Sequence, residues 1–279
     1  MEENHNQEIP AQPSFERAAP APLLSVQHLS KSFGGLTAVD DVTLDVQKGQ
    51  IFSIIGPNGA GKTTVFNLIT GIYKPTSGKM LLGGRSIGGK TPDKVLRSGI
   101  ARTFQNIRLF NNMTVLENVL VGQHIKMPGD LVSIVFRLPH YRRAEKRAHA
   151  HAVELLSFFG PSMVALKDEY ASNLSYAYRR RVEIARAIAS SPQLLLLDEP
   201  TAGMNDAETA EAIGYIQRLR AEYGVTIMLI EHKLQVTMGI SDHIVVLDYG
   251  KKIAEGVPAE IQRNELVIEA YLGRKAVVE

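Results

Sequence analysis

Short apolar runs divided by glycine-containing turns characterise the N-terminal third of the chain. The runs cover residues 23–26, 42–46, 51–55, 79–82 and 100–104. Runs of this length, bounded by turn residues, are typical of β-strands. Residues 1–22 come before them and are rich in Ala, Pro, Glu, Gln and Asn, with few apolar side chains to bury. We therefore expect a disordered tail followed by strands.

The middle of the chain, from about residue 106 to residue 190, has apolar positions at helical spacing. Thr114 precedes one such stretch and is a candidate N-cap, and residues 142–159 form another stretch that ends at Gly160. The second stretch carries Arg142, Arg143, Lys146 and Arg147. Acidic lipid headgroups would attract such a cluster, but a solvated helix face is the favoured interpretation.

Strands and helices alternate after residue 190. Strand-like runs cover residues 194–197, 226–230, 244–247 and 252–254, and helices are predicted over 208–222 and 258–272. Together with the strand at 51–55, this alternation predicts a mainly parallel sheet with helices packed against it. Ligands of such sheets bind at the carboxyl ends of the strands, so chemically active side chains are expected there.

One loop at a strand end has the pattern G-x-x-x-x-G-K-[ST], which holds nucleotide phosphates. It consists of Gly56, Pro57, Asn58, Gly59, Ala60, Gly61, Lys62 and Thr63, with Thr64 behind it. The glycines let backbone N–H groups point at phosphate oxygens, and the following helix directs its positive end at the same anion. Lys62 can reach the β- and γ-phosphates, and Thr63 can offer its hydroxyl to Mg²⁺. The loop therefore predicts binding of ATP or GTP.

Two adjacent acids, Asp198 and Glu199, follow the apolar run 194–197. Carboxylates at the end of a buried strand are costly unless they meet a cation or a water molecule that they activate. Asp198 is placed to hold Mg²⁺, directly or through water. Glu199 is placed to polarise the water that attacks the γ-phosphate. This pair therefore favours nucleotide hydrolysis.

Composition excludes several other kinds of chemistry. The chain has 279 residues, of which 31 are basic and 29 acidic, and its net charge of +2 does not favour a nucleic-acid partner. It contains no cysteine, which excludes disulfides, thiolate metal sites and cysteine nucleophiles. No stretch approaches the roughly 20 apolar residues that span a bilayer, and residues 1–22 do not resemble a signal peptide. We expect a soluble protein.

Another helix is predicted to begin after Ser175, which is a candidate cap or anion ligand at its N-terminus. Arg179, Arg180 and Arg181 lie in the first turn, where the helix dipole disfavours cations. Glu183, four residues after Arg179, offsets part of this charge. The remaining positive charge suits a phosphate or an acidic partner, and solvated arginines are the alternative.

The order of these segments resembles the ATP-binding-cassette (ABC) ATPases over about residues 23–272. The resemblance implies an α/β fold in which a RecA-like P-loop core carries an antiparallel β subdomain and an inserted α-helical subdomain at about 106–190. It also implies an ATPase domain at 23–257, preceded by the tail at 1–22 and followed by a C-terminal helical extension at 258–279. ATP and Mg²⁺ are the implied cofactors.

The resemblance assigns roles to several residues. Residues 56–63 take the place of the Walker A loop, and residues 194–199 take the place of Walker B with Glu199 as the catalytic glutamate. Gln105 corresponds to the Q-loop residue that ligates Mg²⁺ and senses the membrane subunit. His232 corresponds to the switch histidine that contacts the γ-phosphate. Lys62, Gln105, Glu199 and His232 are thus the implied catalytic set.

The remaining implied roles concern adenine and the paired cassette. Phe33 matches the aromatic residue that stacks on adenine, and residues 202–206 match the D-loop. Cassettes of this family pair head to tail. The signature segment of one chain, here Ser175, Tyr176 and Ala177, therefore closes over the ATP on the other chain.

The signature departs from the family pattern Leu-Ser-Gly-Gly-Gln. Residues 174–178 read Leu-Ser-Tyr-Ala-Tyr, so that Ala177 replaces the second glycine and Tyr178 the glutamine. A methyl group matters at position 177 if φ is positive there or if the γ-phosphate approaches very closely. We predict that the ATP site completed by this signature is the weaker of two, and that Ala177→Gly raises transporter ATPase activity.

The finer resemblance is to the cassettes of branched-chain (hydrophobic) amino acid importers. It rests on residues 101–110, 113–119, 254–258 and 269–272. Related cassettes serve urea, short amides and other amino acids. The resemblance implies two transmembrane permease subunits, a second cassette (a sister chain or a second copy) and, indirectly, a periplasmic substrate-binding protein. It places the chain at the cytoplasmic face of the inner membrane.

Other classes of P-loop protein fit the residues less well. A soluble ABC ATPase without transport would carry two cassettes or a long coiled-coil insert, and neither is visible. A lipopolysaccharide exporter has a similar short cassette, but residues 104–110 and the unusual signature disfavour it. A small-molecule P-loop kinase would lack the segment 174–178 ahead of Asp198 and Glu199.

Overall fold

The N-terminal strands form an antiparallel sheet in the computed structural model, which describes residues 21–127, 136 and 138–272. The sheet has the order β2-β1-β4-β5 and consists of β1 (Leu24–Phe33), β2 (Leu36–Val46), β4 (Ser77–Leu82) and β5 (Arg85–Ser86). Every pair in it is antiparallel. The predicted antiparallel subdomain is therefore confirmed.

A second, six-stranded sheet forms the centre of the molecule. Its order is β10-β9-β3-β8-β7-β6, with β3 (Ile51–Ile55), β6 (Ile100–Arg102), β7 (Leu194–Asp198), β8 (Thr226–Ile230), β9 (His243–Asp248) and β10 (Lys251–Gly256). Only the pairing of β10 with β9 is antiparallel. Because the other strands run parallel, their carboxyl ends meet at one edge. The predicted parallel sheet is confirmed.

The central strands β3, β7 and β8 are buried at every position, as expected for parallel strands covered on both faces. Alternate residues of β3 point to different apolar cores. Phe52 and Ile54 join the core with α1 (Lys62–Ile69) and the antiparallel sheet, whereas Ile51 joins the core on the opposite face. The P-loop strand is therefore fixed from both sides.

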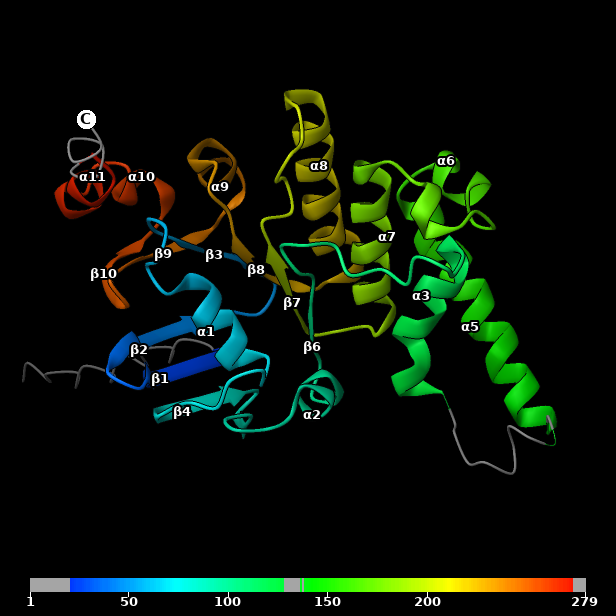
Figure 1. The fold of residues 1–279 in the computed structure, drawn as a ribbon, viewed down its shortest axis with the longest axis horizontal. Coiled ribbons are helices and arrows are strands. Elements are labelled where there is room, and N and C mark those ends of the chain that lie inside the picture. The colour runs from blue at the N-terminus through cyan, green and yellow to red at the C-terminus, as the bar shows by residue number, and fades with distance from the viewer. Residues whose placement is uncertain (1–20, 128–135, 137, 273–279) are drawn as a thin grey trace, which may run out of the picture.

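The helices of the core lie around this sheet (Figure 1). Besides α1 they are α2 (Pro92–Arg97), α8 (Asp206–Tyr223) and α9 (Leu234–Ile240). Asn205 caps α8, because its side-chain oxygen accepts a hydrogen bond from the backbone N–H of Glu208 at 2.9 Å. Within the described ranges, no helix combines the length and apolar character needed to cross a bilayer.

The helices of the middle segment gather on one side of the molecule, coloured green in Figure 1. They are α3 (Val115–Gln123), η1 (His124–Lys126), α5 (Pro139–Phe158), α6 (Pro161–Ala165), η2 (Ala171–Asn173) and α7 (Tyr176–Ala189). Thr114 caps α3 as predicted, since its hydroxyl accepts a hydrogen bond from the N–H of Glu117. The inserted helical subdomain is therefore present as expected.

The C-terminal helix is shorter than predicted. Instead of one helix over 258–272, the structure has α10 (Pro258–Ile261) and α11 (Glu265–Leu272). Asn264 separates them, because its side-chain oxygen accepts a hydrogen bond from the N–H of Val267 and so starts a new helix. Most of the predicted tail at 1–22, and residues 273–279 of the predicted extension, lie outside the described residues.

Candidate nucleotide-binding site

The P-loop connects the carboxyl end of β3 to α1, and two of its positions require glycine. Gly56 and Gly61 have φ values of 147° and 97°. A Cβ atom on Gly56 would lie 2.0 Å from the carbonyl oxygen of Leu247, and one on Gly61 would lie 2.5 Å from that of Ala38. No side chain caps the start of α1. The N–H groups of its first turn are therefore suited to bind an anion.

Lys62 is buried within the loop. Its Nζ atom donates hydrogen bonds to the carbonyl oxygens of Gly56 at 2.7 Å and Pro57 at 2.9 Å. The first residue of α1 thus places a positive charge where the loop and the helix terminus also favour an anion. This arrangement is suited to nucleotide phosphates.

A cavity of about 360 Å³ lies over the P-loop and joins distant segments of the chain. Its lining includes the predicted residues Asn58, Gly59, Ala60, Gly61, Lys62, Thr63, Thr64, Gln105, Glu199 and His232. The sequence separates these residues into four segments, which the parallel strands bring to one edge of the sheet. Leu36, Tyr249 and Gly250 also line the cavity, and sequence reasoning missed them. The position of Tyr249 directly after β9 was the available signal for this residue.

The side chains of Gln105, Glu199 and His232 converge on one atom. Oε1 of Glu199 accepts a hydrogen bond from Nε2 of Gln105 at 3.0 Å and lies 2.8 Å from Nε2 of His232. Glu199 also has φ at 50°, which is rare for a residue other than glycine. Such backbone strain is typical of functional sites. The structure therefore brings these three predicted residues together.

Phe33 does not line this cavity. Its ring contacts the ring of Tyr73 edge-on, with 5.1 Å between the centroids, and the Nζ atom of Lys31 lies 4.7 Å from its centroid. The side chain is 42% exposed at the end of β1. Stacking of Phe33 on adenine stays a prediction.

Asp198 is buried at the end of β7, next to Glu199, and forms an ion pair that the sequence did not predict. Its Oδ2 atom accepts a hydrogen bond at 2.6 Å from Nη2 of Arg102, at the end of the adjacent strand β6. The predicted donors for Mg²⁺ are the hydroxyl of Thr63, the amide oxygen of Gln105 and the carboxylate of Asp198. Oxygen donors of these kinds fit a hard divalent cation.

The signature segment lies at the start of α7. Ser175 occupies the N-cap position, but its side chain makes no capping hydrogen bond, and both Ser175 and Tyr176 are exposed. Ala177 lies inside the helix and has no positive φ. The methyl group would matter if φ were positive or if the γ-phosphate approached very closely, and the first of these conditions is not met. None of these three residues lines the cavity over the P-loop of their own chain.

Arg180 on α7 is paired inside the molecule, so neither expectation about these arginines holds for it. Arg180 is 1% exposed and donates to Oε2 of Glu183 at 2.8 Å and to the carbonyl oxygens of Phe104 at 2.7 Å and Gln105 at 2.9 Å. Glu183 thus pairs with Arg180 rather than Arg179. Burial raises the pKa of Glu183 above its ordinary value. This pair fixes the backbone on which Gln105 stands.

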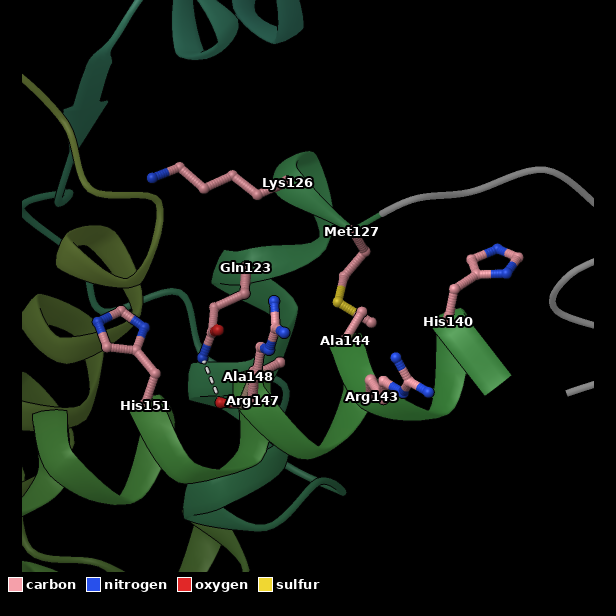
Figure 2. Close-up of a pocket in the computed structure, with 9 residues that line it drawn as sticks. All are labelled: Gln123, Lys126, Met127, His140, Arg143, Ala144, Arg147, Ala148 and His151. Atoms are coloured by element: carbon pink, nitrogen blue, oxygen red, sulfur yellow. Dashed lines mark hydrogen bonds between the residues drawn. The ribbon is translucent and has the colours of Figure 1, made fainter. Parts of the chain in front are cut away.

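Two of the other cavities in the described part of the chain matter for the argument below. One, of about 550 Å³, lies between the end of α3 with η1 and the side of α5, and its lining includes Lys126, His140, Arg143, Arg147 and His151 but no acidic residue (Figure 2). Figure 2 also shows the side chain of Gln123 donating a hydrogen bond to the carbonyl oxygen of Ala148 at 2.9 Å. The interpretation of this basic face, whether lipid-facing or solvated, stays a prediction.

The other, which we call the lateral groove, has a volume of about 710 Å³ and separates the core from the helical subdomain. Its walls come from α2, β6, the end of α3 with η1, and α7. Apolar side chains such as Ile72, Leu96 and Phe110 line it together with Arg97, Arg102, Arg108 and Arg186. Its composition suits a segment of another protein.

Comparison with known proteins gives matches over almost the whole chain. Residues 39–202 match the family model for ABC transporters, and residues 251–277 match that for the branched-chain amino acid ATP-binding cassette transporter. The high-affinity branched-chain amino acid transport ATP-binding protein BraF of Pseudomonas aeruginosa is 46% identical over 252 residues, which are 90% of this chain and 98% of that protein. The corresponding protein LivG of Escherichia coli is 47% identical over 252 residues, with the same coverage.

A solved structure has the same fold. The crystal structure of the ADP conformation of MJ1267, an ATP-binding cassette of an ABC transporter, superposes with a TM-score of 0.78 and 33% identity, covering 90% of this chain and 98% of that one. The P-loop, the paired acids and the convergent residues at the strand ends are therefore set in the fold of an ABC cassette. This chain belongs to the ABC transporter family, as one of its ATP-binding ATPase subunits.

Proposed function

We propose that this chain is the ATP-hydrolysing subunit of an importer that takes up branched-chain amino acids, or other small amino acids or amides, into the cell. The observation that carries the proposal is the meeting of Gln105, Glu199 and His232 over an intact P-loop. The names of the BraF and LivG relatives support the substrate class. They support an importer over a lipopolysaccharide exporter or an ATPase without transport.

The geometry accounts for hydrolysis of ATP in a simple sequence. Lys62 and the N–H groups at the start of α1 bind the phosphates, and Thr63 and Asp198 supply oxygens to Mg²⁺. When bound, Mg²⁺ neutralises charge on the β- and γ-phosphates. Glu199 then orients the attacking water and accepts its proton. Gln105 and His232 hold the Glu199 carboxylate at Oε1, which leaves Oε2 for the water.

A second cassette is required by this proposal, because the signature residues do not reach the P-loop of their own chain. Ser175 and Tyr176 are exposed at the start of α7, a helix of 14 residues whose N-terminus favours an anion. We infer that they contact ATP on a partner cassette, which is a sister chain or a second copy. No nucleic acid takes part.

The lateral groove is the surface that we assign to the permease. It combines apolar side chains with four arginines, and its lining includes Phe104, the residue before Gln105. A permease segment seated there would reach the residue that we assign to the hydrolytic site. Two permease subunits, each with one cassette, would then place the chain at the cytoplasmic face of the inner membrane, and a periplasmic binding protein would deliver the substrate.

Reconstitution tests the proposal. We would place the chain in proteoliposomes with the permease subunits, the sister cassette and the binding protein of the same organism, and measure ATP-driven uptake of labelled leucine. Uptake that requires ATP and is lost in Glu199→Gln is expected. An assembled complex that hydrolyses ATP but takes up no amino acid or amide would contradict the substrate class. A complex without ATPase activity would contradict the function itself.

A further inference from the structure

Arg102 is a buried charged residue beside the nucleotide site, and the mechanism above does not use it. Its side chain is 5% exposed, and that of its partner Asp198 is 2% exposed. Burying two charges costs several kcal/mol per ion, and an ion pair recovers this cost only when the geometry is good. The buried pair of Arg102 and Asp198 is therefore weak evidence for a role in stability, and we looked for a role in the nucleotide site.

The contacts of Arg102 join three parts of the site. Nη1 donates to Oδ1 of Asn67 at 2.7 Å and to the hydroxyl of Thr70 at 3.3 Å, both on the P-loop helix α1 or at its end. Nη2 donates to Asp198, at the end of β7. The guanidinium also lies 5.1 Å from the ring centroid of Phe104, which precedes Gln105. One side chain therefore links the Walker A helix, Walker B and the Q-loop.

The same side chain reaches the lateral groove. Arg102, Thr70 and Phe104 all line it, whereas Asp198 lines neither the groove nor the cavity over the P-loop. The guanidinium thus stands between the groove and the carboxylate. A displacement of Phe104 or of β6 by a bound segment would move the hydrogen-bond donor of Asp198.

We propose that Arg102 is a positioning residue that sets the carboxylate of Asp198 for Mg²⁺ and makes this carboxylate sensitive to occupation of the lateral groove. The second part rests on the proposed function, because it takes a permease segment as the occupant. The first part depends only on this chain. A planar guanidinium holds Asp198, Asn67 and Thr70 at once, and a lysine ammonium cannot reproduce this fork.

Binding of a fluorescent ATP analogue to the isolated chain tests the first part, with and without Mg²⁺. Loss of a side chain that orients a metal ligand costs about 10- to 100-fold in metal affinity. In Arg102→Lys we expect the Mg²⁺ concentration for half-maximal enhancement of binding to rise about 10-fold, with binding in the absence of Mg²⁺ unchanged. Arg220→Lys is the matched control, since Arg220 also pairs with an aspartate, Asp242 at 2.9 Å, but lines neither the groove nor the cavity over the P-loop.

The possible outcomes separate positioning from a structural role. Equal losses with and without Mg²⁺, or equal shifts in both variants, would overturn the proposal. If Arg102→Lys fails to fold in a thermal melt, Arg102→Met combined with Asp198→Asn removes both charges, and its binding should no longer respond to Mg²⁺. A normal response to Mg²⁺ in this double variant would also overturn the proposal.

The groove is tested separately in the reconstituted complex. Permease assembly should stimulate the ATPase rate of the Arg220→Lys complex as in the unaltered chain, and should stimulate the Arg102→Lys complex several-fold less. Equal stimulation would overturn the coupling to the groove. The Mg²⁺ titration uses no permease, so its result does not depend on the proposed function.

Discussion

Nε2 of His232 lies 2.8 Å from Oε1 of Glu199, although the two residues stand on loops that follow different strands. This distance is that of a hydrogen bond, which His232 donates when Nε2 carries the proton. The strands β7 and β8 pair in parallel, with Asp198 opposite Ile230. The fold therefore places the two side chains together, and the geometry makes Glu199 the acceptor for two residues that flank the cavity.

Replacing Glu199 by Gln should separate nucleotide binding from hydrolysis. The amide keeps the size of the side chain but cannot accept a proton from water, so we expect hydrolysis to fall by about 100-fold or more while ATP still binds. Phosphate release and ATP binding should both be measured. Glu222→Gln is the control, because Glu222 pairs with Arg218 on the exposed side of α8. Unchanged hydrolysis in Glu199→Gln would remove Glu199 from the mechanism.

His232→Ala should lower hydrolysis through its contact with Glu199. We expect a loss of about 10- to 100-fold, because the carboxylate loses one of the two groups that orient it. A double-mutant cycle with Glu199→Gln measures the contact directly. Residues that share a hydrogen bond give non-additive effects, so the double variant should be about as slow as Glu199→Gln alone. Additive losses would mean that the two residues act separately.

Lys62→Ala should impair ATP binding itself. The ammonium group lies inside the P-loop, and charge-assisted hydrogen bonds to phosphate are stronger than neutral ones. We expect the Kd for ATP to rise by at least 10-fold in equilibrium binding. Lys79→Ala provides a matched control on an exposed position of β4. Similar affinity in the two variants would contradict the role of Lys62.

The pair of Arg180 and Glu183 predicts a pH-dependent stability. Burial raises the pKa of Glu183 from 4.5, so the native state binds this proton at a higher pH than the unfolded chain does. The contribution of the group is present below about pH 4.5 and is lost as the pH rises through the native pKa. Glu183→Gln should therefore flatten the fall in the free energy of unfolding over this range, as measured by urea titration at several pH values. An unchanged pH profile would contradict the raised pKa.

The sequence was sufficient for the parts of the site that are local in the chain. The P-loop and the acids at 198–199 follow strands that their apolar neighbours already indicate, so their place at the sheet edge follows from the alternation of strands and helices. Arg102 and Arg180 were different. The carboxylate that pairs with Arg102 lies 96 residues away, and the carbonyl oxygens that accept hydrogen bonds from Arg180 lie 75 and 76 residues away. Only the pairing of β6 with β7 and the packing of α7 bring these groups together.

Phe33 shows that a local pattern in the sequence does not fix the direction of a side chain. Its position next to a pair of glycines led to the prediction of an adenine contact, which stays untested, and its side-chain direction depends on the hairpin of β1 and β2. That hairpin turns the ring toward Tyr73. Leu36 and Tyr249 line the cavity, and only the position of Tyr249 directly after β9 could have indicated either of them.

Ala177→Gly tests whether the signature limits the paired cassettes. Because Ala177 has no positive φ, any gain must come from closer approach of the N–H groups of α7 to the γ-phosphate on the partner cassette. We expect a higher ATPase rate in the assembled transporter, despite the roughly 1 kcal/mol cost of glycine in a helix. Ala207→Gly is the matched control, since Ala207 is the second residue of α8 as Ala177 is of α7. An unchanged rate would show that the methyl group is harmless.

The molecular mass of the Glu199→Gln variant in the presence of ATP identifies the partner cassette, when it is measured for this chain alone and after mixing with a sister cassette. A dimer of this chain alone means that its signature segment works. A dimer that forms only with the sister chain means that one of the two ATP sites is weak.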